Sequence, residues 1–506
     1  MSIEGEAAEI RPPSLLDAVI PVVVLIILIA TSVALFGIDA TEGPLQVALL
    51  TSAATAALVA RKNGHEYIHI SEAVVGGISS AMGAIFILLA VGALIGTWNM
   101  SGTTPTVVYY GIKLLDPEFF YVAAAAICAA VGLVTGSSWT TAGTLGVAFV
   151  GMAPVLEVSP EITAGAVISG SYFGDKMTPL SETTILVPQL VGGLTVYEHI
   201  RALLWTTGPA IAIALVIFLV LGLQEDVTAT SDQKDAATAA IDSVYNISFI
   251  NLLPLVLLIV CAFRKYPPFM SVFAAALLAG VMGAFTQPDL VQDFADDPDL
   301  GAFLASIKAI YAAMGTGFVL ETGIEPLDQL FSRGGMSSML TTIWLVLGAL
   351  AFASVMEHAG FLGRLFEGVM RLARSTGALI ATVAATSIGL NVIACDQYVA
   401  IVMPARTFRL EFQKRQIAPQ VLSRTVEDTG TVTSALVPWN TCGAYMTGTL
   451  GVSTFDYFPY AFFNLLNPVI SVLYGLTGFQ VKKIPPEEGT PEPFVGVEPS
   501  TEGAMQ

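Results

Sequence analysis

The sequence predicts an all-α polytopic membrane protein, built from two inverted-topology repeats with broken helices and crossing the bilayer roughly 10–12 times. Three observations support this fold class. The chain of 506 residues is 54% hydrophobic and only 12% charged, which lies outside the range of soluble globular domains. Two parts of the chain resemble each other in sequence. Polar residues interrupt apolar segments in both of these parts.

Long uncharged runs provide the spans. Most contain about the 20 residues that are needed to cross the hydrocarbon core of a bilayer. The runs cover residues 18–36, 43–60, 73–98, 202–223, 249–263, 269–286, 337–356 and 457–479. The segment before the first run is acidic where a secretory signal would be basic, so we expect the first span to remain in the mature protein.

The internal similarity is visible in two pairs of segments. "GGISSAMGAIFILLAVGAL" (76–94) matches "GGMSSMLTTIWLVLGAL" (334–350), and "DAVIPVVVLIIL" (17–28) matches "INLLPLVLLIVC" (250–261) with aligned prolines. The chain therefore divides into two homologous halves. We expect a cytoplasmic N-terminal tail (1–14), a first transmembrane repeat (15–223), an external polar linker (224–248), a second, inverted repeat (249–480) and a disordered acidic cytoplasmic tail (481–506).

Basic residues predict opposite orientations for the two halves, because Lys and Arg accumulate in cytoplasmic loops. Arg61 and Lys62 follow the second span, so the first span should start inside. Arg264 and Lys265 follow the first span of the second half, so that span should start outside. We expect a multi-pass protein of the cell membrane with both termini in the cytoplasm.

Polar interruptions mark the candidate binding site. They fall within residues 129–154 and 170–190 of the first half, and within 388–404 and 421–445 of the second. Paired interruptions in inverted repeats indicate a substrate site near the midplane of the membrane. The freed carbonyls, hydroxyls and carboxylates suit a hard cation.

Three carboxylates are the principal candidates for binding Na+: Asp175, Asp396 and Asp428. Asp396 should be in register with Ser138. The remaining predicted ion-binding residues are Thr178, Ser181, Thr183, Ser138, Thr140, Thr141, Glu427, Thr431 and Asn440. Structural alternatives exist for several of them. Asp175 could pair with Lys176 at a helix end, the hydroxyls could satisfy the backbone, and Glu182 and Glu427 could be solvated helix ends.

Other features exclude some function classes. The four cysteines show no C-x-x-C spacing, so neither a disulfide framework nor a zinc site is indicated. The chain also has no phosphate-binding loop for ATP. The net charge of −19 comes largely from water-exposed segments, and it indicates either a surface adapted to high salt or a vestibule that concentrates cations.

Four segments resemble signatures of the NhaC family of Na+/H+ antiporters: "SGSYFGDKMTPLSETT", "WNMSGTTPTVVYYG", "SRGGMSSM" and "VEDTGTVTSALVPWNTCGAYM". The resemblance covers nearly the whole chain except the linker and both tails. It implies the larger ion-transporter superfamily, with re-entrant hairpins and elevator-like movement, and it places the GDKMTPLSETT segment in the ion pathway. The acidic surface indicates a halophilic prokaryote as the source.

The resemblance leaves two functions open. The first is exchange of Na+ for H+ through a shared carboxylate site, and the alternative is a cation-coupled organic-acid (malate/lactate-type) or amino-acid exchanger. An organic anion usually requires an arginine in its site, and Arg424 alone lies within the interrupted segments. This favours the antiporter. We expect no enzymatic activity and no cofactor; the expected partners are Na+, H+ and the lipid bilayer, with a homodimer as the candidate assembly and no nucleic acid.

Overall fold

The computed structural model describes residues 10–154, 156–225, 231–264, 266–370 and 373–484. Within them the chain is helical, with one isolated β-bridge between Ile417 and Lys483. Among the described residues, eight helices are long and apolar enough to cross a membrane, or ten if each of two bent pairs counts as one span. This confirms a polytopic helical fold. Most of the predicted acidic tail lies outside the described residues, and part of the predicted linker forms helix α12 (Ser231–Val244).

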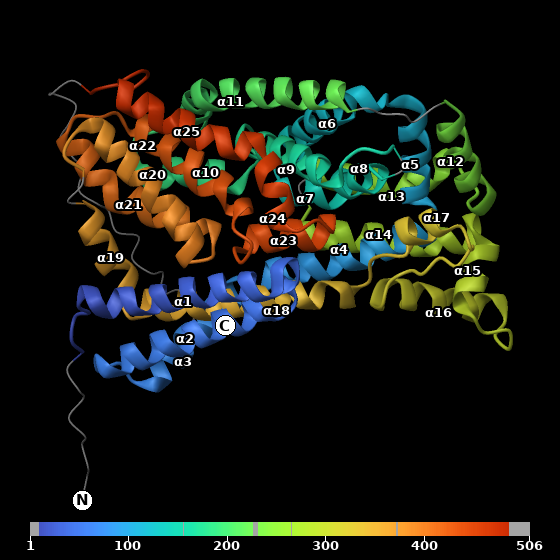
Figure 1. The fold of residues 1–506 in the computed structure, drawn as a ribbon, viewed down its shortest axis with the longest axis horizontal. Coiled ribbons are helices and arrows are strands. Elements are labelled where there is room, and N and C mark those ends of the chain that lie inside the picture. Colours follow the sequence, from blue (N-terminus) through green and yellow to red (C-terminus); the bar gives the residue numbers. More distant parts are fainter. Residues whose placement is uncertain (1–9, 155, 226–230, 265, 371–372, 485–506) are drawn as a thin grey trace, which may run out of the picture.

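The helices lie in two layers that run along the long axis of the molecule (Figure 1). One layer contains α1 (Leu15–Phe36), α2 (Pro44–Lys62), α3 (Tyr67–Ser80), α4 (Met82–Met100), α14 (Pro268–Thr286), α16 (Ala302–Gly315) and α18 (Leu340–His358). The other contains α6 (Phe120–Thr135), α9 (Pro160–Lys176), α11 (Val196–Gln224), α20 (Thr376–Ile393), α21 (Gln397–Lys414), α22 (Pro419–Val426) and α25 (Phe462–Thr477).

Shorter helices connect and complete these layers. They are α5 (Thr103–Leu114), α7 (Ser138–Thr141), α8 (Val147–Met152), α10 (Glu182–Val191), α13 (Leu253–Phe263), α15 (Pro288–Ala295), α17 (Glu325–Phe331), α19 (Phe361–Met370), α23 (Thr441–Leu450) and α24 (Thr454–Tyr457). Two single π turns, η3 (Ala142–Gly146) and η6 (Glu427–Thr431), interrupt the helical segments that contain α7 and α22.

The first layer is built from reciprocal contacts between the two halves. Helix α18 of the second half packs on α2 of the first, and α4 of the first half packs on α14 of the second. Two residues after the last residue of each helix, α4 and α18 are followed by a glycine with positive φ, Gly102 (+78°) and Gly360 (+71°). Elements that correspond in the sequence alignment thus make corresponding contacts. Which end faces the cytoplasm stays a prediction from the basic residues.

The second layer contains a matched pair of helix breaks. Helix α6 ends at Gly136 (φ +69°), and α20 is followed by Cys395 (φ +56°). The next residue in each half, Ser137 or Asp396, caps the following helix by accepting a backbone N–H bond. The structure therefore pairs Asp396 with Ser137, one residue before the Ser138 that the alignment predicts, because the helix ends fix the register.

Candidate functional site

A cavity of about 800 Å³ lies where the helix breaks meet the first layer. Segments of α4 and α14 line one side. The other side is formed by the α6–α7 break, the α9–α10 connection, the start of α21 and the start of α23. The polar and aromatic residues that line it include Thr135, Ser137, Ser138, Trp139, Thr140, Asp175, Ser181, Glu182, Thr183, Asp396, Gln397, Tyr398 and Thr441. None of the lining residues in the described part of the chain is Lys, Arg or His.

Asp175 projects into this cavity from the last turn of α9, although it is only 9% exposed. Its Oδ2 accepts a hydrogen bond from the Ser138 backbone N–H (2.9 Å) and another from the Ser138 hydroxyl (2.7 Å). These donors stabilise the charged carboxylate in a buried place. Asp175 does not form the helix-end ion pair with Lys176 that was the alternative to a role in ion binding.

Asp396 reaches the same cavity from the other half of the chain. Its Oδ1 accepts the Val399 backbone N–H (3.1 Å), so it caps the first turn of α21. The structure thus brings together two of the three predicted carboxylates, one from each half.

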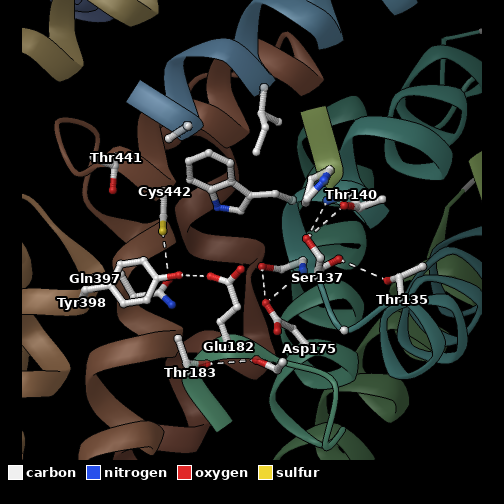
Figure 2. A pocket seen from close by; sticks show the side chains of 18 of the residues that line it. Thr135, Ser137, Thr140, Asp175, Glu182, Thr183, Gln397, Tyr398, Thr441 and Cys442 are labelled. Atoms are coloured by element: carbon white, nitrogen blue, oxygen red, sulfur yellow. Dashed lines mark hydrogen bonds between the residues drawn. The ribbon is translucent and has the colours of Figure 1, made fainter. Parts of the chain in front are cut away.

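Glu182 adds a carboxylate that the sequence reasoning left as a solvated helix end. It is exposed at the first residue of α10 and lines the cavity. Figure 2 shows its side chain beside that of Asp175, with the Tyr398 hydroxyl donating a hydrogen bond to Glu182 Oε2. Its place in the S-E-T-T part of the GDKMTPLSETT segment was the signal that could have identified it. Tyr398 had no comparable signal in the sequence.

The predicted acids Glu427 and Asp428 lie behind the cavity, in η6. Both are completely buried and neither is among the lining residues. Glu427 Oε1 accepts a hydrogen bond from Thr183 (2.9 Å), a residue that does line the cavity. Asp428 forms an ion pair with Lys176. The structure therefore separates Asp428 from the other two predicted carboxylates.

The predicted hydroxyl and amide residues divide in the same way. Ser138, Thr140, Ser181 and Thr183 line the cavity. The others satisfy the backbone or lie in the interior: Thr141 donates to the Ser137 carbonyl (2.9 Å), Thr178 accepts from the Leu180 N–H (3.4 Å), Asn440 caps α23 by accepting from the Cys442 N–H (3.0 Å), and Thr431 is buried in η6.

An aromatic contact joins the two halves beside the cavity. The rings of Trp139 and Tyr445 stack with their centroids 4.0 Å apart, and the Tyr445 hydroxyl donates to the Trp139 carbonyl (2.8 Å). Trp139 lines the cavity and Tyr445 is completely buried. Because aromatic stacking fixes both position and orientation, this contact holds the first turn of α7, and with it Ser138, against α23.

Comparisons with known proteins show the family to which this chain belongs. Residues 4–192 and 172–479 match the Na+/H+ antiporter family. The Na+/H+ antiporter NhaC of Alkalihalophilus pseudofirmus is 39% identical over 82% of this chain and 86% of its own. The arginine/ornithine antiporter ArcD of Halobacterium salinarum is 33% identical over 95% and 96%, and the malate-2H+/Na+-lactate antiporter of Bacillus subtilis is 31% identical over 93% and 96%. This chain is therefore a multi-pass membrane transporter, not an enzyme, and it belongs to the Na+/H+ antiporter family.

Proposed function

We propose that this protein exchanges Na+ for H+ and that both ions use the same carboxylates, Asp175 and Asp396. One observation carries the proposal: acids from helix breaks in opposite halves, Asp175 at the end of α9 and Asp396 at the start of α21, line one cavity whose described lining contains no basic residue. The family membership and the similarity to NhaC antiporters support exchange of these two ions.

The chemistry of the cavity suits such competition. A buried carboxylate is costly to leave charged, so it is neutralised either by a proton or by a bound cation. Na+ prefers oxygen ligands, and the hydroxyls of Ser138, Thr140 and Ser181 lie in the same lining as Asp175. When a proton leaves, the carboxylate becomes a cation ligand; when the proton returns on the other side, Na+ is released. Both loaded states carry less charge than the empty one, which favours movement of the loaded protein.

A second candidate is exchange of a cationic amino acid. A cavity of about 800 Å³ is much larger than an ion requires, and the similar ArcD protein is named for arginine and ornithine. Carboxylates with Trp139 and Tyr398 nearby would suit such a ligand. Exchange of an organic acid such as malate is less favoured, because the described lining supplies no basic partner for a carboxylate.

Transport by purified protein in liposomes tests the proposal. A trapped pH dye should report proton movement when Na+ is added outside, whereas malate, lactate or arginine alone should give none. Asp175→Asn and Asp396→Asn should each lower exchange by orders of magnitude, because the titratable oxygen is lost while the shape is kept. A Glu replacement should retain partial activity with a shifted pH optimum.

The matched control is Asp289→Asn, which neutralises an exposed carboxylate in α15 and should leave exchange unchanged. Wild-type Na+/H+ exchange in both site variants at normal abundance would contradict the proposal. Proton movement driven by arginine instead of Na+ would favour the second candidate.

A further inference from the structure

Lys176 and Asp428 form a completely buried ion pair that the exchange chemistry does not use. Lys176 is the last residue of α9 in the first half of the chain, and Asp428 lies in the π turn η6 of the second half. Lys176 Nζ contacts Asp428 Oδ1, and both side chains are 0% exposed. The pair therefore joins the two halves directly, close to the site but outside the cavity lining.

The same carboxylate oxygen receives donors from two further helices. The Thr206 hydroxyl of α11 lies 3.0 Å from Asp428 Oδ1, and the Asn467 side-chain amide of α25 also lies 3.0 Å from it. Asn467 in addition donates to the Asp428 backbone carbonyl (3.3 Å). Asp428 thus connects α9, α11 and α25 to η6. Asp428 Oδ1 is thus occupied by an ammonium group and two neutral donors, and Oδ2 is buried in a residue outside the cavity lining. This carboxylate is therefore poorly placed to bind and release a cation at each transport step.

Neighbouring residues of α9 face opposite surroundings. Asp175 points into the cavity and accepts hydrogen bonds from Ser138, whereas Lys176 points away from it toward Asp428. The end of α9 is therefore held on both sides. Loss of the contact at Lys176 would release the helix terminus that places the Asp175 carboxylate.

We propose that the Lys176–Asp428 pair is a fixed clasp that positions Asp175, and that Asp428 does not carry the transported ion. This inference rests on the proposed role of Asp175 in exchange. Glu427 and Arg424 are the other charged groups that act on Lys176. Because the charges of the two clasp residues cancel, the clasp adds no net charge that the cargo would have to neutralise.

Replacing one or both members of the clasp distinguishes this role from ion binding. Lys176→Met or Asp428→Asn alone leaves one uncompensated charge in the interior, which is strongly destabilising, whereas neutralising both members together removes the whole pair. Each single variant should have reduced membrane abundance. The protein that remains should need at least about tenfold more Na+ for half-maximal exchange, since Asp175 is displaced.

The double variant Lys176→Met/Asp428→Asn should recover abundance. Its half-saturating Na+ concentration should remain at least about tenfold above that of wild type, because the contact that positions Asp175 is still missing. Its pH profile should be unchanged, because Asp428 does not carry the ion. Adding Asp175→Asn to this double variant should abolish exchange, which tests the proposed function independently of the clasp.

Two results would overturn the clasp. A well-expressed double variant without exchange would show that Asp428 itself handles the ion or the proton. A wild-type Na+ requirement, in the single variants or in the double variant, would show that the pair contributes stability alone and does not position Asp175.

Discussion

Ser138 holds the Asp175 carboxylate with two donors from one residue. The backbone N–H is available because Ser138 starts a helix after the break at Gly136, and the hydroxyl lies 2.7 Å from Asp175 Oδ2. A helix break therefore supplies the backbone donor, and the choice of serine supplies the second. This arrangement stabilises the charged form of Asp175 while leaving its remaining lone pairs to the cavity.

Ser138→Ala should weaken Na+ binding without abolishing exchange. The backbone donor remains, so the loss should be about 1–2 kcal/mol, roughly a 5- to 30-fold increase in the Na+ concentration at half-maximal rate. The control is Thr144→Val, which removes a hydroxyl that donates to the Thr140 and Thr141 carbonyls inside the same segment. Equal Na+ requirements for the two variants would argue against a role for the Ser138 hydroxyl.

At the scale of elements, α9 is held in place by close packing against α6. A methyl group at Gly170 would lie 2.1 Å from the Ala125 carbonyl oxygen, and one at Gly174 would lie 2.5 Å from the Ala129 carbonyl oxygen. Small residues on this face let the two helix backbones approach each other, as is common between transmembrane helices. This close packing determines where the last turn of α9, with Asp175 and Lys176, is placed.

Gly170→Ala should force the two helices apart. Overpacking of this kind typically costs about 1–3 kcal/mol, so thermal stability in detergent should fall. Gly76→Ala in α3 is the control, because a methyl group there would meet no described atom within 4 Å, and alanine is the better helix former by about 1 kcal/mol. A Gly170→Ala protein as stable as the Gly76→Ala protein would show that the contact is looser than the structure indicates.

The sequence was sufficient to predict the helix breaks, but not the long-range contacts of the residues beside them. Gly136 and Pro179 are visible in the sequence as interruptions of apolar segments, whereas Gly174 lies inside α9. The polar residues of these segments led to Asp175, and those of residues 388–404 led to Asp396. The ion pair of Lys176 joins residues 252 positions apart, which no local pattern reveals. Adjacent side chains on a helix differ by about 100° in direction. Asp175 and Lys176 can therefore face different surroundings although they are neighbours in sequence.

At the scale of the whole molecule, the sequence similarity between the halves appears as reciprocal packing. Helices α2 and α18 pack together, as do α14 and α4, and the two helix breaks of the second layer meet at one cavity. The repetition of sequence predicted two related halves, whereas the orientation that the basic flanks indicate stays a prediction. Span count was harder to predict, because short and bent helices such as α13 and α24 are not distinguished from full spans by hydrophobicity alone.

The central claim is that Na+ and H+ compete for the carboxylates of one cavity, and Na+-induced proton release tests it most directly. Na+ is added to purified protein in a weakly buffered solution, and the pH is recorded, with an impermeant organic cation at equal ionic strength as the control. The account predicts acidification that saturates with Na+ and disappears in the Asp175→Asn/Asp396→Asn protein. No proton release from the wild type, or undiminished release from the double variant, would contradict it.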